Sequence, residues 1–346
     1  MPPPSPPLVL LTCGDPAGIG PEVAALAWAA TPDHDRARLR LVVDPGMIAS
    51  VLADRRGLPA LPVTEVTAAD PRPSAPGELL VIRPDATTAA AVAPGAVSAA
   101  GGRQAAAAVQ AALALIRDGA AQAMVTGPLH KQSLHAAGCD VPGHTELLAR
   151  GCGLPDAAAS MMLWLPGTSG RGGLGVVHAT LHQSLRSALE DLTADRIVAA
   201  GRRLVPALQA LLGRPPRVAV AALNPHGGEG GLFGDEESRL LAPAVARLAS
   251  LDIDVTGPLP ADSLFLRASR GEFDGIVALY HDQGHIPIKL LGMHRAVNVT
   301  LGLPLVRTSV AHGTAFDIVG TGRADPTSMV AAIAAAIRLV AAGWRG

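Results

Sequence analysis

Aromatic residues are scarce in this sequence, in which three Trp, one Tyr and four Phe make up only 2% of 346 residues. Such a chain offers few flat surfaces on which nucleic-acid bases could stack. Charged residues are also few, at 16%, and the formal net charge is −1. The sequence therefore lacks the excess of basic residues that favours binding to nucleic acid. Together these shortages argue against a nucleic-acid partner.

Cysteines and long apolar runs are equally rare. The three cysteines, Cys13, Cys139 and Cys152, are odd in number and far apart, so they form neither a disulfide framework nor a zinc-ribbon spacing. No uninterrupted apolar stretch reaches about 18 residues, which predicts no membrane span. The first residues lack the basic segment of a signal peptide. We therefore expect a protein of the reducing cytoplasm.

What the sequence does have is apolar content, at 49% of residues with a mean hydropathy of +0.32. This composition excludes a disordered chain, and the length favours two domains or lobes. Short apolar runs that suit buried strands alternate with helical segments along the chain, which predicts an α/β fold with a mixed, largely parallel sheet. The clearest are the runs Leu8–Cys13, Ala123–Thr126, Val218–Leu223 and Gly275–Tyr280, and the Ala-rich helix Gly101–Ile116.

The stretch 274–325 concentrates the chemistry. It opens with the apolar run Gly275–Tyr280, and the carboxyl ends of strands in open α/β sheets are where ligands bind. A metal-capable imidazole, a carboxylate, two cations and an amide follow that run within about 30 residues. These residue types indicate an anion-binding reaction centre formed by His281, Asp282, Lys289, Asn298 and Arg307, before the turn at His312.

Three histidines each stand at or just after the end of a predicted strand, namely His182, His226 and His281. Three imidazoles converging from strand ends would suit a divalent metal such as zinc, with one position left open for substrate. Their separations of 44 and 55 residues form no local metal motif, so a structural role for each histidine stays open. His178 and His285 are neighbours that could replace one of them.

Predicted helix starts supply further polar groups. Pro21 and Glu22 suit the first turn of a helix. His144 and Thr145 follow Gly143, where free N–H groups can hold an anion, or where Thr145 serves only as an N-cap. Asp262 occupies a natural N-cap position of a short helix.

A Gly-rich segment, residues 170–175, matches the spacing G-x-G-x-x-G. A dinucleotide-binding fingerprint needs a helix after its glycines, whereas the residues after this segment, Val176–Thr180, read as a strand. We therefore interpret the segment as a hairpin loop and not as a cofactor site.

Taken together, these residues resemble the 4-hydroxythreonine-4-phosphate dehydrogenase family of pyridoxal phosphate biosynthesis. The matching segments run in order through nearly the whole chain: GDPAGIGPE from Gly14, TGPLHK from Thr126, GHTELLA from Gly143, NPHGGEGG from Asn224, GPLPADSLF from Gly257, YHDQG from Tyr280, NVTLGLP from Asn298, RTS from Arg307 and HGTA from His312. The first and last of these are more distantly similar to isocitrate and isopropylmalate dehydrogenases.

The resemblance implies a role for each matching residue. It makes His182, His226 and His281 the ligands of one divalent metal ion (zinc, magnesium, cobalt or manganese). It implies catalytic roles for Asp262, Asp282 and Lys289. Substrate would contact His144, Thr145, Lys289, Asn298 and Arg307, and NAD or NADP would lie on His312, Gly313, Thr314, Ala315 and Asp317. Ala311 stands where many relatives carry Asp, which removes a charge beside the cofactor loop.

The resemblance also implies a fold and an assembly. We expect a two-lobed, three-layer α/β/α structure like that of isocitrate and isopropylmalate dehydrogenases. One lobe would comprise residues 1–127 and 301–346, and the other, residues 128–300, would carry the metal site and the dimer interface. The expected active site lies in the cleft between them and is completed by the second chain of a homodimer.

The implied activity is oxidation, with decarboxylation, of 4-phosphohydroxy-L-threonine to 3-amino-2-oxopropyl phosphate. The segments at His178 and His281 look closer to relatives that act on D-threonate or D-erythronate 4-phosphate, or on terephthalate dihydrodiol. A metal-dependent phosphohydrolase and a non-catalytic phosphate-binding protein would also use such cations, but neither needs the HGTA segment.

Overall fold

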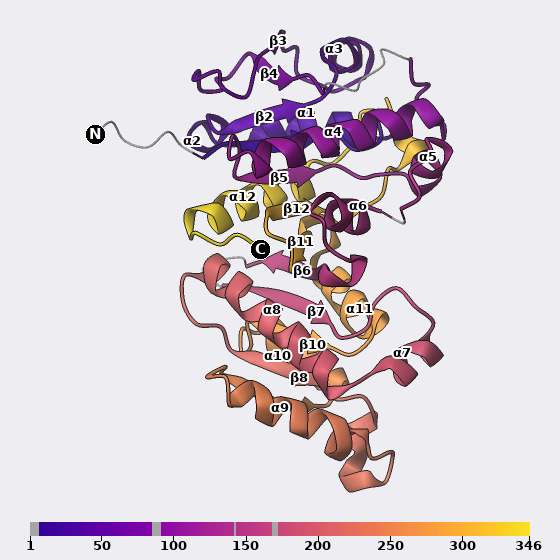
Figure 1. The fold of residues 1–346 in the computed structure, drawn as a ribbon, viewed down its shortest axis with the longest axis vertical. Helices are drawn as coiled ribbons and strands as arrows, with labels where there is room; N and C mark the ends of the chain where they lie inside the picture. The colour runs from indigo at the N-terminus through magenta and orange to yellow at the C-terminus, as the bar shows by residue number, and fades with distance from the viewer. Residues whose placement is uncertain (1–6, 85–90, 142, 168–171) are drawn as a thin grey trace, which may run out of the picture. The chain divides into compact units, whose positions relative to one another are not determined.

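A computed structural model describes residues 7–84, 91–141, 143–167 and 172–346. The chain divides into two compact units (Figure 1). Unit 1 comprises residues 1–159, 303–341 and 345–346, and unit 2 comprises residues 160–302 and 342–344. In this division residues 128–159 fall in unit 1. Among the described residues, none of the helices combines the length and the apolar character needed to cross a membrane.

The sheet of unit 1 is parallel and runs in the order β3-β4-β2-β1-β5-β12. Its central strands are four to five residues long and fully buried, which is why they read as continuous apolar runs without alternation. The strands are β1 (Val9–Thr12), β2 (Leu39–Val42), β3 (Val63–Glu65), β4 (Leu79–Ile82), β5 (Ala123–Thr126) and β12 (Val306–Val310).

Helices cover both faces of this sheet. Met124 of β5 shares a buried cluster with Val109 of α4 (Ala99–Arg117). Thr308, whose register partner on β5 is Val125, points to the other face and donates a hydrogen bond to Ala332 of α12 (Thr327–Ala341). The remaining helices of unit 1 are α1 (Gly20–Ala30), α2 (Asp33–Arg36), α3 (Pro45–Asp54), α5 (Lys131–Ala136) and α6 (His144–Gly151).

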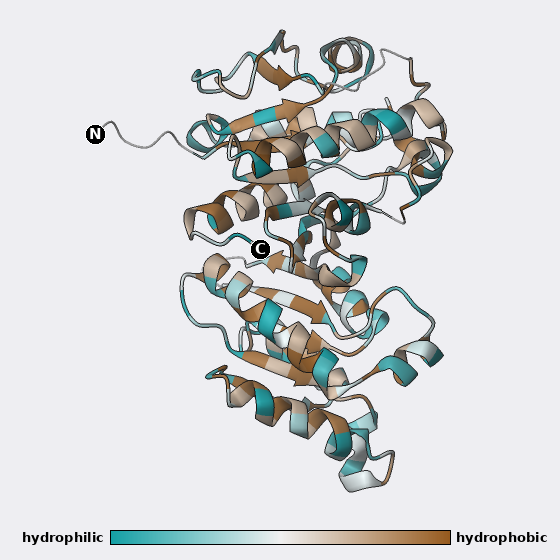
Figure 2. Cartoon of the chain, in the orientation of Figure 1, coloured by the Kyte–Doolittle hydropathy of each residue, from teal (hydrophilic) through white to brown (hydrophobic). Residues whose placement is uncertain are grey.

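The sheet of unit 2 is mixed and runs in the order β11-β6-β7-β10-β8-β9. Strand β6 is antiparallel to both of its neighbours, whereas β7, β10, β8 and β9 are parallel to one another. In Figure 2 these strands are predominantly brown, as expected for a buried layer. The strands are β6 (Ser160–Pro166), β7 (Gly173–His178), β8 (Val218–Ala221), β9 (Val255–Leu259), β10 (Gly275–Ala278) and β11 (Val297–Leu301).

Unit 2 is also three-layered. Val176 and Ile276 share a buried cluster with Leu264 of α10 (Ala261–Ser269) and Ile288 of α11 (His281–Gly292). Gly175 of β7 points the other way, where a Cβ would lie 2.7 Å from Leu208 of α8 (Ala194–Leu212), so glycine permits this close approach. The remaining helices are α7 (Leu185–Asp191) and α9 (Ala242–Ala249).

The predicted fold class, a three-layer α/β structure with a mixed, largely parallel sheet, is confirmed. Strands β6 and β7 pair antiparallel from Pro166 and Gly173 onward and form a hairpin as predicted, and the last three residues of the Gly-rich segment, 173–175, begin β7. Gly170 and Arg171 of that segment lie outside the described residues. The sequence predicts one helix from His182 to about Leu204, and this prediction was wrong, because Leu192 and Thr193 separate α7 from α8 and Thr193 caps α8.

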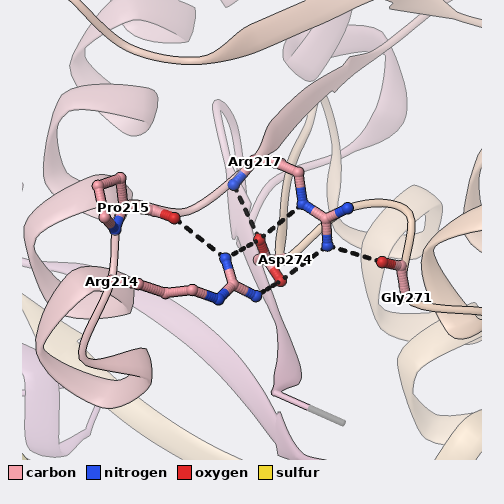
Figure 3. Close-up of polar contacts among 5 residues, drawn as sticks. All are labelled: Arg214, Pro215, Arg217, Gly271 and Asp274. Carbon is pink, nitrogen blue, oxygen red and sulfur yellow. Dashed lines mark hydrogen bonds and ion pairs between the residues drawn. The ribbon is translucent and has the colours of Figure 1, made fainter.

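Asp274 fastens the start of β10 to the segment between α8 and β8 (Figure 3). Its carboxylate is 4% exposed and accepts hydrogen bonds from the Arg214 guanidinium at 2.7 and 2.9 Å and from Arg217 at 3.3 Å. Burial raises the pKa of Asp274, but the hydrogen bonds from Arg214 and Arg217 outweigh burial and lower the pKa to about 2. The charged carboxylate therefore stabilises the folded state.

We expect Asp274→Asn to lower the free energy of unfolding at neutral pH by about 1–2 kcal/mol. This value allows for the solvent that screens the ion pairs, because Arg214 and Arg217 are half-exposed. Because the folded pKa lies below the ordinary 3.8, this stabilisation is present above pH 4 and is lost between about pH 4 and 2. Urea unfolding of both proteins over this range measures it. A difference between them that stays constant down to pH 2 would contradict the assignment.

Candidate functional site

Four imidazoles gather in unit 2 at the carboxyl ends of β7 and β10. His281 begins α11, and its ring stacks on that of His285 with centroids 3.8 Å apart. Nδ1 of His285 lies 3.1 Å from Nε2 of His178, the last residue of β7. The His182 ring lies 5.9 Å from that of His281. We call these four residues the histidine cluster.

The histidine cluster contains neutral imidazoles. Burial, and less strongly the neighbouring His285, lowers the pKa of His178 to about 3. Burial also lowers the pKa of His285 to about 4, with contributions from His281 and Lys289. Nδ1 of His178 is buried and has no hydrogen-bond partner among the described residues. Neutral imidazoles with available lone pairs are the form that binds metal ions.

The close packing of α11 on β7 brings the cluster together. Gly284 permits it, because a Cβ at this position would lie only 2.4 Å from Nε2 of His178. The side chain of Gln283 fixes the turn before the helix by accepting from Leu279 N and donating to Ala222 O, both at 2.7 Å. The segment YHDQG thus positions its histidine through its glutamine and glycine.

His226 lies apart from the histidine cluster. It is exposed, adopts a left-handed backbone conformation with φ 54°, and has Phe233 as its ring neighbour, with centroids 6.4 Å apart. Its loop is anchored by Glu237, which accepts hydrogen bonds from Leu223 N and Asn224 N at 2.8 and 2.7 Å. Within the described ranges, no group of three or more His, Cys, Asp or Glu side chains is arranged to hold a metal ion. The proposed ligands therefore fit a metal in type, but only His182 and His281 lie together.

The predicted catalytic residues of unit 2 are solvent-exposed. Asp282 is in the first turn of α11, and its Oδ1 lies 2.6 Å from Nδ1 of His281. Lys289 is two turns further along the same helix and lies close enough to His285 to lower its pKa. Asp262 is in the first turn of α10, where Pro260 takes the N-cap position, so the predicted N-cap role of Asp262 was wrong. Asn298 lies half-buried on β11.

Unit 1 carries a separate cationic centre at the carboxyl end of β5. Arg307 of β12 is 4% exposed, and its guanidinium donates to Thr126 Oγ1 at 2.7 and 3.1 Å. Burial lowers the pKa of Arg307 to about 9, so the group keeps its charge at neutral pH. Burial, and then the Arg307 charge, lower the pKa of His144 well below its ordinary value. An anion bound at this centre would relieve the electrostatic cost of the buried cation.

His144 and Thr145 lie in the first turn of α6, for which Gly143 is the N-cap. The alternative that Thr145 caps this helix was therefore wrong. Nε2 of His144 is buried and lacks a hydrogen-bond partner among the described residues. A buried polar atom without a partner costs free energy, which a ligand can recover by bonding to it. Pro142 lies outside the described residues.

The loop of residues 312–317 packs on the residues that directly precede α1 in unit 1. Thr314 O accepts from Ile19 N at 2.9 Å, and a Cβ at Gly18 would lie 2.6 Å from that same oxygen. Ala315 adopts a left-handed conformation, and the Phe316 ring after it stacks on His130 with centroids 4.8 Å apart. The motifs at Gly14, Thr126 and His312, far apart in sequence, therefore form one local structure.

A cavity of about 670 Å³ in unit 1 is lined in part by Val319, which follows this loop in the chain. Its walls include Pro16, Arg55 and Gly320. Arg55 forms an ion pair of 3.1 Å with the buried Glu22, which also accepts from Gly320 N at 2.9 Å. This volume falls within the range of small-molecule and cofactor sites.

Sequence reasoning missed three parts of these sites. The pairing of His178 with His285 depends on how α11 lies on β7, and the close approach at Gly284 could have indicated it. The anchoring role of Glu237 and the Glu22–Arg55 ion pair depend on contacts between segments distant in sequence. The sequence signal for the ion pair is a carboxylate in an apolar segment, as at Glu22 between Ile19 and Val23. A carboxylate that is buried in such a segment is normally paired with a cation.

Comparison with known proteins agrees with these motifs. A relative from Beijerinckia indica, named 4-hydroxythreonine-4-phosphate dehydrogenase, is 41% identical over 95% of this chain and 94% of its own length. A D-threonate 4-phosphate dehydrogenase from Pectobacterium atrosepticum is 40% identical over 96% of this chain and 99% of its own. The crystal structure of a 4-hydroxythreonine-4-phosphate dehydrogenase from Klebsiella pneumoniae superposes with a TM-score of 0.83 at 40% identity, covering 96% of this chain and 99% of that one.

The model of one protein family matches residues 37–336, most of the chain. Its description is the pyridoxal phosphate biosynthetic protein PdxA. The match spans the Arg307 centre, the histidine cluster and the loop of residues 312–317. The chain belongs to the family of the pyridoxal phosphate biosynthetic protein PdxA.

Proposed function

We propose that the chain is an NAD-dependent dehydrogenase that oxidises the secondary alcohol of 4-phosphohydroxy-L-threonine and yields 3-amino-2-oxopropyl phosphate with loss of CO2. The observation that carries this proposal is the buried Arg307 cation beside His144, whose buried Nε2 has no hydrogen-bond partner in the described part of the chain, together with relatives that are named as dehydrogenases of phosphorylated substrates. A phosphate monoester has the charge and the acceptor oxygens that such a centre requires.

In this proposal each set of residues has one task. Arg307 and His144 bind the phosphate, with Thr145, Lys289 and Asn298 as further substrate contacts. Oxidation moves a hydride from the alcohol carbon to the nicotinamide ring, and the hydroxyl proton must pass to a base. Asp282 and Lys289, both exposed on α11, are the proposed proton acceptors, and Asp262 assists.

The metal is part of the proposal. A divalent ion would be held by His182, His226 and His281, and when bound it would stabilise negative charge on a substrate oxygen. The chain's own contribution is to keep His281 in place through Gln283 and Gly284. Because His226 is apart from the other two ligands, the loop of residues 225–231 would have to rearrange when the metal binds.

For the cofactor we propose the 670 Å³ cavity of unit 1 and the adjoining loop with His312, Gly313, Thr314, Ala315 and Asp317. Val319 and Gly320, which follow this loop and line the cavity, support the proposal. NADP is the alternative cofactor. The alternative substrate is D-threonate or D-erythronate 4-phosphate, which the name of the Pectobacterium relative favours.

The decisive assay follows nicotinamide absorbance and phosphate release with a panel of 4-phosphorylated four-carbon hydroxy acids. We expect reduction of NAD with 4-phosphohydroxy-L-threonine, without phosphate release. Faster turnover of D-threonate 4-phosphate would identify that compound as the substrate, and the reaction would still be an NAD-dependent oxidation. Phosphate release without NAD reduction would indicate a phosphohydrolase, and preference for an unphosphorylated cyclic diol would indicate the terephthalate branch.

We further propose a homodimer that associates through unit 2. Of the eleven large hydrophobic side chains exposed among the described residues, ten lie in this unit, and Leu290 of α11 is the most exposed at 83%. Such side chains indicate an association surface. We expect sedimentation to give a dimer and Leu290→Asp to shift it toward monomer, whereas Leu251→Asp, outside α11, should not. A fully active wild-type monomer at assay concentration would contradict the proposal.

A further inference from the structure

A second cavity lies in unit 2, at the end of the sheet where β7 and β10 begin and β6 ends. It measures about 410 Å³. Four arginines and one carboxylate line it, together with the chain at Pro166–Gly167 and Gly172–Leu174. We call it the arginine pocket, and its charged residues are Arg214, Arg217, Arg270, Arg295 and Asp274.

The arginine pocket carries more positive charge than the fold requires. Four guanidinium groups against one carboxylate leave a formal charge of +3. The ion pairs with Asp274 account for Arg214 and Arg217, which fasten β10 to the segment before β8 (Figure 3). Arg270 and Arg295 take no part in these ion pairs. Arg270 is exposed and makes no side-chain hydrogen bond or ion pair among the described residues. Nη1 of Arg295 donates a hydrogen bond to Pro166 O at 3.3 Å.

The two paired arginines also keep donors available. Arg214 and Arg217 are 46% and 45% exposed although both bind Asp274. Nη1 of Arg217 has no hydrogen-bond partner among the described residues, and Figure 3 shows this nitrogen without a dashed line. Guanidinium groups present paired N–H donors that match the oxygens of a phosphate.

The remaining walls of the pocket are apolar or small. Leu165, Leu174 and Leu291 line it, with glycine at positions 167, 172, 173 and 271. Glycines allow a ligand to approach the main chain closely. A ligand of this pocket would therefore combine an anionic group with an apolar or planar part, within a volume that suits a nucleoside phosphate.

We propose that the arginine pocket is a second ligand site of this protein, which binds a small phosphate-bearing molecule such as a nucleoside diphosphate. It lies at the opposite end of β7 and β10 from the histidine cluster, separated by the four residues of β10, or about 13 Å of strand. The site is thus distinct from the histidine cluster, and it belongs to a different unit from the Arg307 centre and the 670 Å³ cavity.

The test is isothermal titration with pyrophosphate and with ADP on the full chain. The variant is Arg270→Gln/Arg295→Gln, which leaves the Asp274 ion pairs intact, and its thermal stability should match that of the wild type. Arg202→Gln, an exposed arginine of α8 outside the pocket, is the control for loss of charge. We expect the double variant to weaken pyrophosphate binding at least about tenfold, and the control to leave it unchanged.

Arg307→Ala separates this pocket from the proposed substrate site. Pyrophosphate bound in the arginine pocket should bind Arg307→Ala with unchanged affinity. Binding that survives in Arg270→Gln/Arg295→Gln but is lost in Arg307→Ala would place the anion in unit 1 and overturn the proposal. Absence of saturable binding of either probe by the wild-type chain at millimolar concentration would overturn it as well.

Discussion

His226→Ala should remove the bound divalent metal and lower kcat by more than about 100-fold. Loss of a residue that only supports a metal ligand through a hydrogen bond costs at most about 100-fold. The physical reason is that an imidazole ligand contributes directly to metal affinity, whereas His226 contributes nothing to the core, being exposed on its loop. The variant should therefore keep the wild-type circular dichroism spectrum and melting temperature. Metal content by mass spectrometry and turnover under identical conditions measure the effect.

The matched control for this experiment is His294→Ala, an exposed histidine of the same unit outside the histidine cluster. It should keep both metal and activity. His178→Ala and His285→Ala test the alternative ligand set, because these two residues lie beside His281 whereas His226 does not. Loss of metal from these two variants, with full metal in His226→Ala, would falsify the assignment of His226.

Arg307→Ala should lower kcat/KM for the phosphorylated substrate by roughly 10- to 150-fold, the range expected when one charge-assisted hydrogen bond of about 1.5–3 kcal/mol is lost. The penalty should largely vanish with the corresponding unphosphorylated alcohol, because that substrate brings no anion to the buried guanidinium. Steady-state kinetics with both substrates give the comparison directly.

Truncating a buried arginine also perturbs the fold, so Arg307→Ala needs a control of the same kind. Arg40 is 3% exposed in the same unit and donates to Ser74 Oγ at 2.8 Å. Arg40→Ala should lower the melting temperature and yet affect both substrates equally. Arg307→Lys should recover part of the lost activity by restoring the charge without the bidentate geometry. Equal losses on both substrates in Arg307→Ala would assign Arg307 to the fold.

The sequence predicts the secondary structure of this protein well, for a physical reason. Strands buried on both faces appear as short apolar runs bounded by turn residues, and β5 was predicted to the residue as Ala123–Thr126. The start of β10 at Gly275 and the core of α4 followed from the same reasoning. Breaks between helices are harder to predict, because Leu192 and Thr193 interrupt a pattern that is otherwise compatible with one helix.

The residues of the candidate sites are predicted less completely than the secondary structure. The strand end of β10 identified His281, since polar residues after a buried strand stand out, whereas Arg307 was identified as a cation of the stretch 274–325. The contact of His178 with His285 was beyond this reasoning, because it depends on how closely a helix approaches a strand 107 residues away. The position of His226 was also beyond it, because a run of left-handed residues from His226 to Gly230 sets the direction of that loop. The arginine pocket likewise arises from residues contributed by five separate segments.

The discontinuity of unit 1 has a consequence for synthesis on the ribosome. Unit 2 is almost entirely one continuous segment, residues 160–302, so nearly all of its contacts are available once that segment has left the exit tunnel. Unit 1 needs residues 303–341 as well, because β12 pairs with β5 across about 180 residues of intervening chain. Until β12 emerges, one edge of β5 has no partner, and unpaired strand edges invite aggregation. The N-terminal half of the nascent chain therefore cannot complete its sheet until β12 has been synthesised, and it is the part that a chaperone would need to protect.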